Sequence, residues 1–593
     1  MKTTIQNILG YSREFWRHWV TLVVLFLGVN LANQLIFIPI FRLITTYVLQ
    51  AGGIPFISSQ NIRFLFTHHP LVILSLLGEL IVLLLVIYWQ FAFLLLGLKM
   101  VSTQDFNWRE LVKESWNRIK TVRLGSLPMM LLYFILVIPF ADLVFRTPLL
   151  AKVKIPEFIL DYMTRSGSLL TTLIIFYVVI GILGVRLILT LPLMIFRNQH
   201  TRIAMANSWR LTGKGKWWNY LKQLIVLAVI TVILLTIIYA LVYGLQLLLD
   251  LLPKQIAFVS AVINLTGMQA LSGLGIIWSG IIGLQIVLAS LKELSSNNKA
   301  KKSGGRKWII FSTLMILLGG VAVINNYYYL KVTVKRPITI SHRGVSEGNE
   351  VQNTIPAMKR TQKLRPTYVE IDVHETKDHQ FIVMHDENLK KLTGVDKKPH
   401  DLTLRQLKQL TAHENGYHAK LVSLDQYMSA AEKLHQRLLI EVKTTPADSK
   451  KMLQRFNQQY GERIINNHDQ VQSLDYRVVS RLKRLNPRLT ILYIQPYNLT
   501  YPRSMADGYA MEYSTLNFEF IQQAHQQHNL VYSWTVNEPD LMNRLMYDEV
   551  DGLITDNLAE LNSTINNYTK TKSYANKILN YILAISVGNQ FEL

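Results

Sequence analysis

The chain has 593 residues, a formal net charge of +23 and no cysteine. This length predicts several domains, and the lack of cysteine excludes disulfides and thiolate-bound zinc, so a metal must be held by oxygen or imidazole ligands. The positive charge is compatible with nucleic acid binding. However, the Lys and Arg residues cluster beside long apolar segments, where membrane orientation and anionic lipid give a simpler explanation. We therefore expect a lipid bilayer, and no nucleic acid, as a partner.

Residues 1–330 contain apolar segments long enough to cross a bilayer, which requires about 20 residues. The candidate spans are 20–41, 71–98, 124–145, 169–196, 221–249, 256–291 and 308–330. The first segment is too long for a cleavable signal peptide and lacks a small-residue cleavage site, so it predicts a retained anchor. The sequence thus predicts a multi-pass, all-α domain in the cell membrane.

The loops between these spans differ in charge. The loops after the second, fourth and sixth spans are rich in Lys and Arg, whereas the alternate loops carry fewer cations. The positive-inside rule places the cation-rich loops and the N-terminus in the cytoplasm. Seven spans then place the C-terminal half on the opposite face, so we expect that half to be extracellular.

Two ionisable residues, Glu79 and Arg186, fall inside predicted spans. A charge at mid-bilayer is costly, so each residue needs a partner or a wet cavity. One interpretation is a shared polar site between the second and fourth spans. The other, which we favour, is structural pairing or side chains that reach the interface.

From residue 337 to about 560, short β-rich segments alternate with helical patterns, which predicts a parallel sheet. The strand candidates are 338–341, 368–373, 381–384, 438–442, 471–473, 489–494, 531–536 and 552–555, and the segment 509–513 leaves their number open. About eight such units in roughly 220 residues fit a small α/β TIM barrel. Residues 561–593 form a C-terminal tail that starts like a linker, and its apolar part, 578–585, docks on the barrel or touches the membrane.

Four short motifs end predicted strands, where TIM barrels carry their active sites. They are His342-Arg343-Gly344, Glu370-Ile371-Asp372, His385-Asp386 and Glu441-Val442-Lys443. Each motif alone has an ordinary explanation, such as a turn or a surface ion pair. These ordinary explanations do not account for all four motifs together, because charges without a function cost free energy on strands that are otherwise apolar.

The carboxylates of these motifs predict a metal site. Side chains two residues apart share a strand face, so Glu370 and Asp372 point together into the barrel mouth. With Glu441 they form a cluster that would repel itself without a cation, and carboxylate oxygens suit Ca²⁺ or Mg²⁺. We expect His374 to face outward, away from this cluster.

The remaining motif residues suit cleavage of a phosphodiester. Arg343 and Lys443 can bind anionic phosphate oxygens. The imidazoles of His342 and His385 can exchange protons near neutral pH. Trp534 ends a predicted strand and either forms a wall of the pocket or packs inside the barrel.

In this order, the motifs resemble the glycerophosphodiester phosphodiesterase family. The four motifs match, and the third extends over Val383-Met384-His385-Asp386. Further matching stretches are Asn353-Thr354, Ser533-Trp534-Thr535-Val536-Asn537 and Asp551-Gly552-Leu553-Ile554-Thr555-Asp556. The N-terminal half looks like the membrane domain fused to such enzymes in some Gram-positive bacteria. One position departs from the family pattern, because Gln352 replaces the common Glu and removes one acidic group near the metal.

The resemblance implies a TIM barrel that hydrolyses glycerophosphodiesters to glycerol 3-phosphate and an alcohol. It also implies that a glycerol hydroxyl of the substrate attacks phosphorus, and that water opens the resulting cyclic phosphate. The implied roles are divalent metal binding by Glu370, Asp372 and Glu441, general base and acid catalysis by His342 and His385, and phosphate binding by Arg343 and Lys443.

The leading hypothesis is therefore a membrane-anchored, outward-facing, metal-dependent phosphodiesterase. Its substrates are expected to be deacylated phospholipid head groups or polyglycerol-phosphate polymers such as teichoic acid. The alternatives are lysophospholipase D-like cleavage of lipid head groups and a non-catalytic membrane sensor or transporter. The oligomeric state is not indicated by the sequence.

Overall fold

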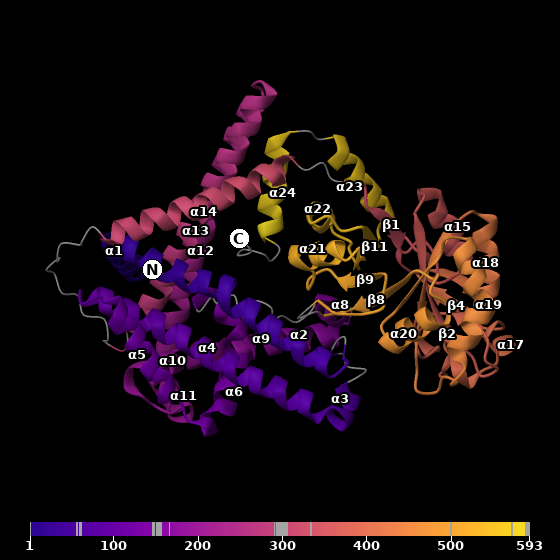
Figure 1. The fold of residues 1–593 in the computed structure, drawn as a ribbon, viewed down its shortest axis with the longest axis horizontal. Helices are drawn as coiled ribbons and strands as arrows, with labels where there is room; N and C mark the ends of the chain where they lie inside the picture. Colours follow the sequence, from indigo (N-terminus) through magenta and orange to yellow (C-terminus); the bar gives the residue numbers. More distant parts are fainter. Residues whose placement is uncertain are drawn as a thin grey trace.

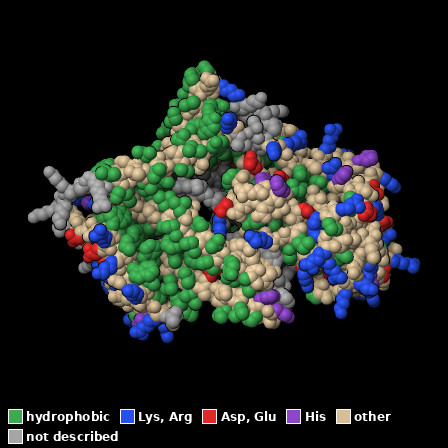
Figure 2. Space-filling view, in the orientation of Figure 1, with side chains coloured by type: hydrophobic (Ala, Val, Ile, Leu, Met, Phe, Trp, Pro, Cys, Tyr) green, Lys and Arg blue, Asp and Glu red, His purple; other side chains and the backbone are tan. Residues whose placement is uncertain are grey.

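The computed structural model describes residues 2–54, 57, 62–144, 149, 157–164, 166–289, 291, 306–331, 335–497, 501–570 and 573–586. It consists of a bundle of long helices and a β/α barrel beside it (Figure 1). Hydrophobic side chains cover the visible surface of the bundle, whereas Lys and Arg are spread over the barrel (Figure 2). A surface of this kind is expected where helices contact lipid.

Among the described residues of the N-terminal half, all regular structure is helical. Its helices are α1 (Lys2–Ala32), η1 (Asn33–Phe37), α2 (Ile38–Ala51), α3 (Ile62–His68), α4 (Pro70–Ser102), α5 (Trp108–Lys120), η2 (Leu124–Ser126), α6 (Leu127–Val144), α8 (Glu157–Thr164), α9 (Gly167–Leu187), α10 (Thr190–Arg197), α11 (Thr201–Leu211), α12 (Lys216–Leu249), α13 (Lys254–Ala289) and α14 (Arg306–Lys331). In the described residues, six helical segments are long and apolar enough to cross a membrane: Thr4–Ala51, Pro70–Ser102, Gly167–Arg197, Lys216–Leu249, Lys254–Ala289 and Lys307–Lys331.

The third predicted span, 124–145, corresponds to α6, whose apolar stretch Leu127–Leu136 is shorter than these six. Helix α6 packs against α9. Arg118 near the end of α5 donates a hydrogen bond to Asn198, which follows α10. The start of α6 and the end of α10 therefore lie at the same face of the bundle, as expected if α6 crosses the membrane and α9 returns.

The two charges in the spans have separate partners. Glu79 accepts a hydrogen bond from Thr45 at 2.6 Å. Arg186 donates to the carbonyl oxygens of Thr212 at 2.9 Å and Trp209 at 2.7 Å, and its guanidinium lies 4.2 Å from the centre of the Trp209 ring. These contacts favour the structural interpretation over a site that Glu79 and Arg186 share.

The C-terminal half contains the strands of a closed barrel. The strands are β1 (Ile338–Ser341), β2 (Tyr368–Glu375), β3 (Phe381–Val383), β4 (Thr411–Glu414), β5 (Tyr417–Lys420), β6 (Arg437–Val442), β7 (Gln470–Ser473), β8 (Ile491–Gln495), β9 (Gly508–Glu512), β10 (Leu530–Trp534) and β11 (Gly552–Thr555). In the described residues, eight parallel strands follow the order β1-β11-β10-β9-β8-β7-β6-β2, and pairing of β1 with β2 closes the ring. This confirms the predicted fold class.

The structure differs from the sequence prediction at two strands. The candidate 381–384 is β3, which pairs antiparallel with β2 and is not one of the eight barrel strands. The uncertain segment 509–513 is instead barrel strand β9, paired in parallel with β8 and β10. Short apolar runs look alike in both roles, because periodicity does not report the direction of the neighbouring strand.

Helices surround the barrel. The helical elements are η3 (His342–Gly344), α15 (Ile355–Thr361), η4 (Gln362–Leu364), α16 (Lys390–Thr393), η5 (Pro399–Asp401), α17 (Leu404–Leu407), α18 (Leu424–Lys433), α19 (Met452–Asn466), α20 (Tyr476–Leu485), α21 (Phe518–Gln526), α22 (Pro539–Tyr547) and α23 (Leu558–Lys570). Strand β2 is buried along its whole length because helices cover its outer face and the barrel interior covers the other. Inside, Ile340, Leu439 and Ile554 belong to an apolar plug beneath the mouth.

The tail contains a helix that contacts both halves. The segment predicted as a linker belongs largely to α23, and α24 (Tyr574–Ser586) follows. On the membrane side, Ile578 packs with Leu330 and Ala261, at the ends of α14 and α13. On the barrel side, Asn580 donates to the Tyr547 hydroxyl of α22 at 3.0 Å. Helix α24 therefore lies between the spans and the barrel, and its contact with the barrel is one of the two alternatives that the sequence left open.

Candidate active site

Three carboxylates meet at the mouth of the barrel. Glu370 and Asp372 lie on β2, and Glu441 lies opposite Asp372 on the neighbouring strand β6. All three residues are buried, and their ligand oxygens lie within 4.8 Å of one another. The structure therefore brings together the three residues that the sequence predicts as metal ligands.

The charges around this cluster are unequally balanced. Burial and the neighbouring carboxylates of Asp372 and Glu441 raise the pKa of Glu370 well above its usual value. Burial also disfavours ionisation of Asp372, but the cations around it, Lys443 first among them, together with a hydrogen bond from Asn353 hold the pKa of Asp372 below its usual value. The ammonium of Lys443 lies 3.0 Å from Asp372 Oδ1 and 2.6 Å from Glu441 Oε1. The Lys443 ammonium stabilises the carboxylates of Asp372 and Glu441, whereas the charge of Glu370 is poorly compensated.

This donor set fits a hard divalent cation. The candidate ligands are carboxylate oxygens, which both Ca²⁺ and Mg²⁺ prefer. A cation would favour the ionised form of Glu370, the form that burial and its neighbours now disfavour. The acidic triad could therefore hold a divalent metal.

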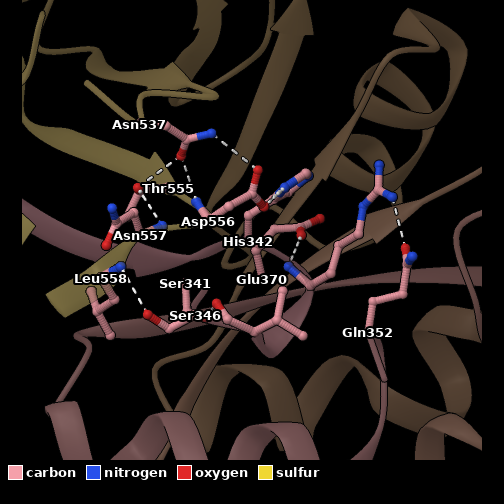
Figure 3. A network of polar contacts seen from close by, with 12 residues as sticks. Ser341, His342, Ser346, Gln352, Glu370, Asn537, Thr555, Asp556, Asn557 and Leu558 are labelled. Atoms are coloured by element: carbon pink, nitrogen blue, oxygen red, sulfur yellow. Dashed lines mark hydrogen bonds and ion pairs between the residues drawn. The ribbon is translucent and has the colours of Figure 1, made fainter. Parts of the chain in front are cut away.

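Arg343 is held by an unusual backbone conformation. Its φ is +54°, and Gly344 follows with φ +72°. A Cβ at Gly344 would also lie 3.0 Å from the Tyr427 hydroxyl, so this turn requires glycine. The turn directs the Arg343 backbone N–H to Glu370 Oε2 at 2.9 Å (Figure 3). This explains why the motif reads His-Arg-Gly.

The guanidinium of Arg343 belongs to a chain of contacts that sequence reasoning missed. It donates to Gln352 Oε1 at 2.7 Å (Figure 3). The Gln352 side-chain amide donates to Glu414 Oε1 at 2.6 Å, and the Gln352 backbone N–H donates to Glu414 Oε2 at 3.0 Å. Glu414 ends β4, in the hairpin outside the barrel. A carboxylate is thus present behind Gln352, although the position of Gln352 itself is neutral.

Both candidate proton carriers have a carboxylate partner. His342 Nδ1 lies 2.7 Å from Asp556 Oδ1, and Asn537 donates to the other oxygen of Asp556 at 3.2 Å (Figure 3). His385 Nδ1 lies 2.8 Å from Asp386 Oδ1. If each Nδ1–H donates to its carboxylate, each Nε2 remains available to substrate.

The two imidazoles differ in their surroundings. Burial lowers the pKa of His385 below its ordinary value, although the hydrogen bond that His385 donates to Asp386 opposes this shift. The Asp556 carboxylate is partly exposed, and the charge of His342 together with hydrogen bonds from His342 and Asn537 lowers its pKa despite the opposing desolvation. His385 therefore favours its neutral form, and His342 faces an ionised carboxylate.

Further residues complete the mouth. Asn353 donates to Asp372 Oδ2 at 2.9 Å and orients that carboxylate. Trp534 donates from its indole N–H to the Ala510 carbonyl at 2.9 Å and packs on the apolar plug, so it is anchored inside the barrel. The expectation that His374 faces outward was wrong: it is 3 % exposed and its Nε2 lies 3.1 Å from the His385 carbonyl oxygen. Residues 372 and 374 share a strand face because they are two positions apart.

Comparisons with known proteins match both halves of the chain. Residues 8–324 match the membrane domain of glycerophosphoryl diester phosphodiesterase, and residues 342–560 match the glycerophosphoryl diester phosphodiesterase family. A glycerophosphodiester phosphodiesterase of Caldanaerobacter subterraneus subsp. tengcongensis is 27% identical over 235 residues, which cover 37% of this chain and 94% of that protein. A human enzyme named Lysophospholipase D GDPD1 is 44% identical over 68 residues, which cover 12% of this chain and 21% of that protein.

Solved structures give matches to the barrel portion. One is an Oleispira antarctica phosphodiesterase in complex with the product sn-glycerol-3-phosphate, at 20% identity and a TM-score of 0.35, covering 39% of this chain and 97% of that one. Another is a glycerophosphodiester phosphodiesterase from Thermotoga maritima, at 22% identity and a TM-score of 0.32. The match covers 39% of this chain and 99% of that one.

Proposed function

Because this chain belongs to the family of membrane-domain glycerophosphoryl diester phosphodiesterases, we propose that its barrel is an outward-facing, metal-dependent hydrolase of glycerophosphodiesters. The products would be glycerol 3-phosphate and an alcohol. The observation that carries the metal dependence is the buried triad of Glu370, Asp372 and Glu441, in which the charge of Glu370 is only partly compensated. We take residues 1–330 as the anchor and 337–560, with the rest of α23, as the catalytic unit.

Glu370, Asp372 and Glu441 would hold the metal, either Ca²⁺ or Mg²⁺. When bound, it would neutralise the charge that develops on phosphate oxygens. Arg343 and Lys443 would bind the remaining phosphate oxygens and orient the phosphorus. Trp534 would pack against the apolar part of the substrate.

The histidines would transfer protons in two steps. In the first, His385 would take the proton of a substrate glycerol hydroxyl as its oxygen bonds to phosphorus, and His342 would give a proton to the departing alcohol oxygen. In the second, water would open the cyclic phosphate while the two histidines exchange these roles. This order is the reverse of the one implied by the family resemblance, and we choose it because burial favours neutral His385.

The outward placement rests on the arrangement of the helices. In Figure 1 the N-terminus, α5 and α11 lie toward one end of the bundle, and the barrel lies beyond the other. Helices α5 and α11 belong to the cation-rich loops that the positive-inside rule assigns to the cytoplasm.

Single cysteines can test this placement, because the chain has none of its own. Lys433→Cys places a thiol on the barrel surface, and Lys113→Cys places one on α5; both positions are exposed. A membrane-impermeant maleimide should label Lys433→Cys in intact cells and Lys113→Cys only after permeabilisation. The opposite pattern would refute the outward placement.

The activity can be tested with purified protein and three substrates: glycerophosphocholine, polyglycerol-phosphate teichoic acid and lysophosphatidylcholine. We expect release of glycerol 3-phosphate from the first, lost with EDTA and restored by Ca²⁺ or Mg²⁺. Release from teichoic acid would extend the substrate class to wall polymers. Choline release from lysophosphatidylcholine alone would favour the lysophospholipase D alternative, which the match to the human enzyme motivates. No hydrolysis of any substrate would sink the enzymatic proposal.

A further inference from the structure

A cavity of about 370 Å³ lies in the membrane domain, far in sequence from the active site. Helices α1 and α4 form its sides, and α5 and α14 contribute one lining residue each, Trp108 and Ile310. Aromatic rings of Trp89 and Phe93 are part of its wall. Its volume is in the range of roughly 300 to 1,000 Å³ that is typical of small-molecule sites.

The lining offers little to water. Gln90 is the polar amide in the wall, and its side chain exchanges hydrogen bonds with Asn33. The indole N–H of Trp89 donates to Ser115 Oγ at 3.1 Å. Because these polar groups are satisfied within the protein and the rest of the lining, apart from the Trp108 indole N–H, is hydrocarbon, the cavity suits an apolar ligand.

The cavity is open at Gly28. This residue is exposed, and a Cβ built there would meet no atom within 4 Å. Gly28 lies inside the candidate span Thr4–Ala51, so the cavity opens toward the lipid that would surround this helix in a membrane. The hydrocarbon nearest to such an opening is a lipid acyl chain.

A cation lies near one end of the cavity. The lining residue Trp108 packs edge-on against Phe106, with ring centres 4.8 Å apart. The ammonium of Lys307, at the start of α14, lies 5.5 Å from the centre of the Phe106 ring. Lys307 is thus placed where a lipid phosphate would lie if its chain entered the cavity.

We propose that this cavity binds one acyl chain of an anionic phospholipid whose phosphate lies beside Lys307. In the topology proposed above, Trp108 and Lys307 are at the cytoplasmic end of their helices, so the lipid would belong to the cytoplasmic leaflet. The site is separate from the barrel chemistry and does not depend on the identity of its substrate.

The test uses the full-length protein, purified in mild detergent, depleted of lipid and mixed with phosphatidylglycerol or phosphatidylcholine. Native mass spectrometry would measure the lipid retained. Gly28→Phe should fill the cavity and weaken phosphatidylglycerol binding at least about tenfold, because each buried methylene contributes to lipid affinity. Gly10→Phe is the matched control, since Gly10 is on the same helix, is also exposed with nothing within 4 Å of its Cβ position, and does not line the cavity.

Lys307→Gln tests the head-group contact. It should lower the preference for phosphatidylglycerol over phosphatidylcholine about fivefold, the effect expected for one cation at a membrane surface. Thermal unfolding in detergent is the control for folding of every variant, and Ala32→Phe, at another lining position, is a second cavity-filling variant if Gly28→Phe is unstable. Retention of phosphatidylglycerol at the wild-type level by Gly28→Phe or Ala32→Phe would overturn the proposal, as would equal loss in Gly10→Phe.

Discussion

The barrel and the membrane domain both hold charged groups away from bulk water, but they arrange them differently. In the barrel, Glu370, Asp372 and Glu441 crowd within 4.8 Å of one another. Among the helices, Glu79 and Arg186 are separate, and each has its own hydrogen-bond partners. Crowded carboxylates cost folding free energy, so their presence indicates a ligand, whereas dispersed and satisfied charges are consistent with architecture.

The largest effect is expected when one of the three crowded carboxylates is replaced. Glu370→Gln should lower kcat/KM for glycerophosphocholine by about 10³-fold, because a metal ligand is lost from the charge-stabilising group. The same change should raise Tm, since it removes a poorly compensated carboxylate. Steady-state kinetics and thermal unfolding followed by circular dichroism would measure both. Activity within tenfold of wild type would contradict the assignment of Glu370.

The next effect concerns the proton carriers. His385→Gln should lower kcat by at least about 10²-fold, and His468→Gln, at an exposed position outside the mouth, should not. If neutral His385 is the base, kcat/KM falls as pH decreases through its lowered pKa. Asp386→Asn removes a hydrogen bond that raises this pKa, so the acid limb of the pH profile should move to lower pH. A shift to higher pH would refute the role of Asp386.

A smaller effect tests the contacts behind Arg343. In Gln352→Glu, two carboxylates would face each other where Gln352 and Glu414 are now 2.6 Å apart, so we expect KM to rise about tenfold. The double variant Gln352→Glu with Glu414→Gln restores one carboxylate and one amide, and should recover most of the loss. Double-mutant analysis of kcat and KM would measure the coupling. Additive effects would mean that Glu414 does not position Arg343.

The smallest effect on catalysis is expected in the membrane domain. Arg186→Gln should leave kcat of the folded enzyme unchanged, because its guanidinium binds Trp209 and Thr212 within the membrane domain. It should lower stability by about 1–3 kcal/mol, because two hydrogen bonds from a charged donor and the cation–π contact with Trp209 are lost. Thermal unfolding in detergent and hydrolysis at low temperature would separate the two. Loss of kcat without loss of stability would contradict a purely structural role for Arg186.

The sequence was most informative where a local rule applied. The two-residue period of β2 brings Glu370 and Asp372 to one face, and the barrel rule brings Glu441 beside them. The same rule, applied consistently, would also have placed His374 inside. The barrel strand β9 was left uncertain, because a short apolar segment does not reveal its neighbours.

Other contacts could not be predicted, because they join distant segments. Glu414 is 62 residues from Gln352, and Asp556 is 214 residues from His342. No local period relates these pairs, and only the closed barrel and its hairpin bring them together. The Thr555-Asp556 strand end was recognised as part of a family motif, but its contact with His342 was not.

Helix α24 has a consequence for the order of assembly. It follows every span and every barrel strand in the chain, so the ribosome makes it after all of them. Its docking site combines Asp250, which accepts from the Ala575 N–H at 2.8 Å, and Tyr547 of α22, so the site exists only when the spans are inserted and the barrel is folded. Packing of α24 is therefore a late step of assembly, which follows insertion of the spans and folding of the barrel.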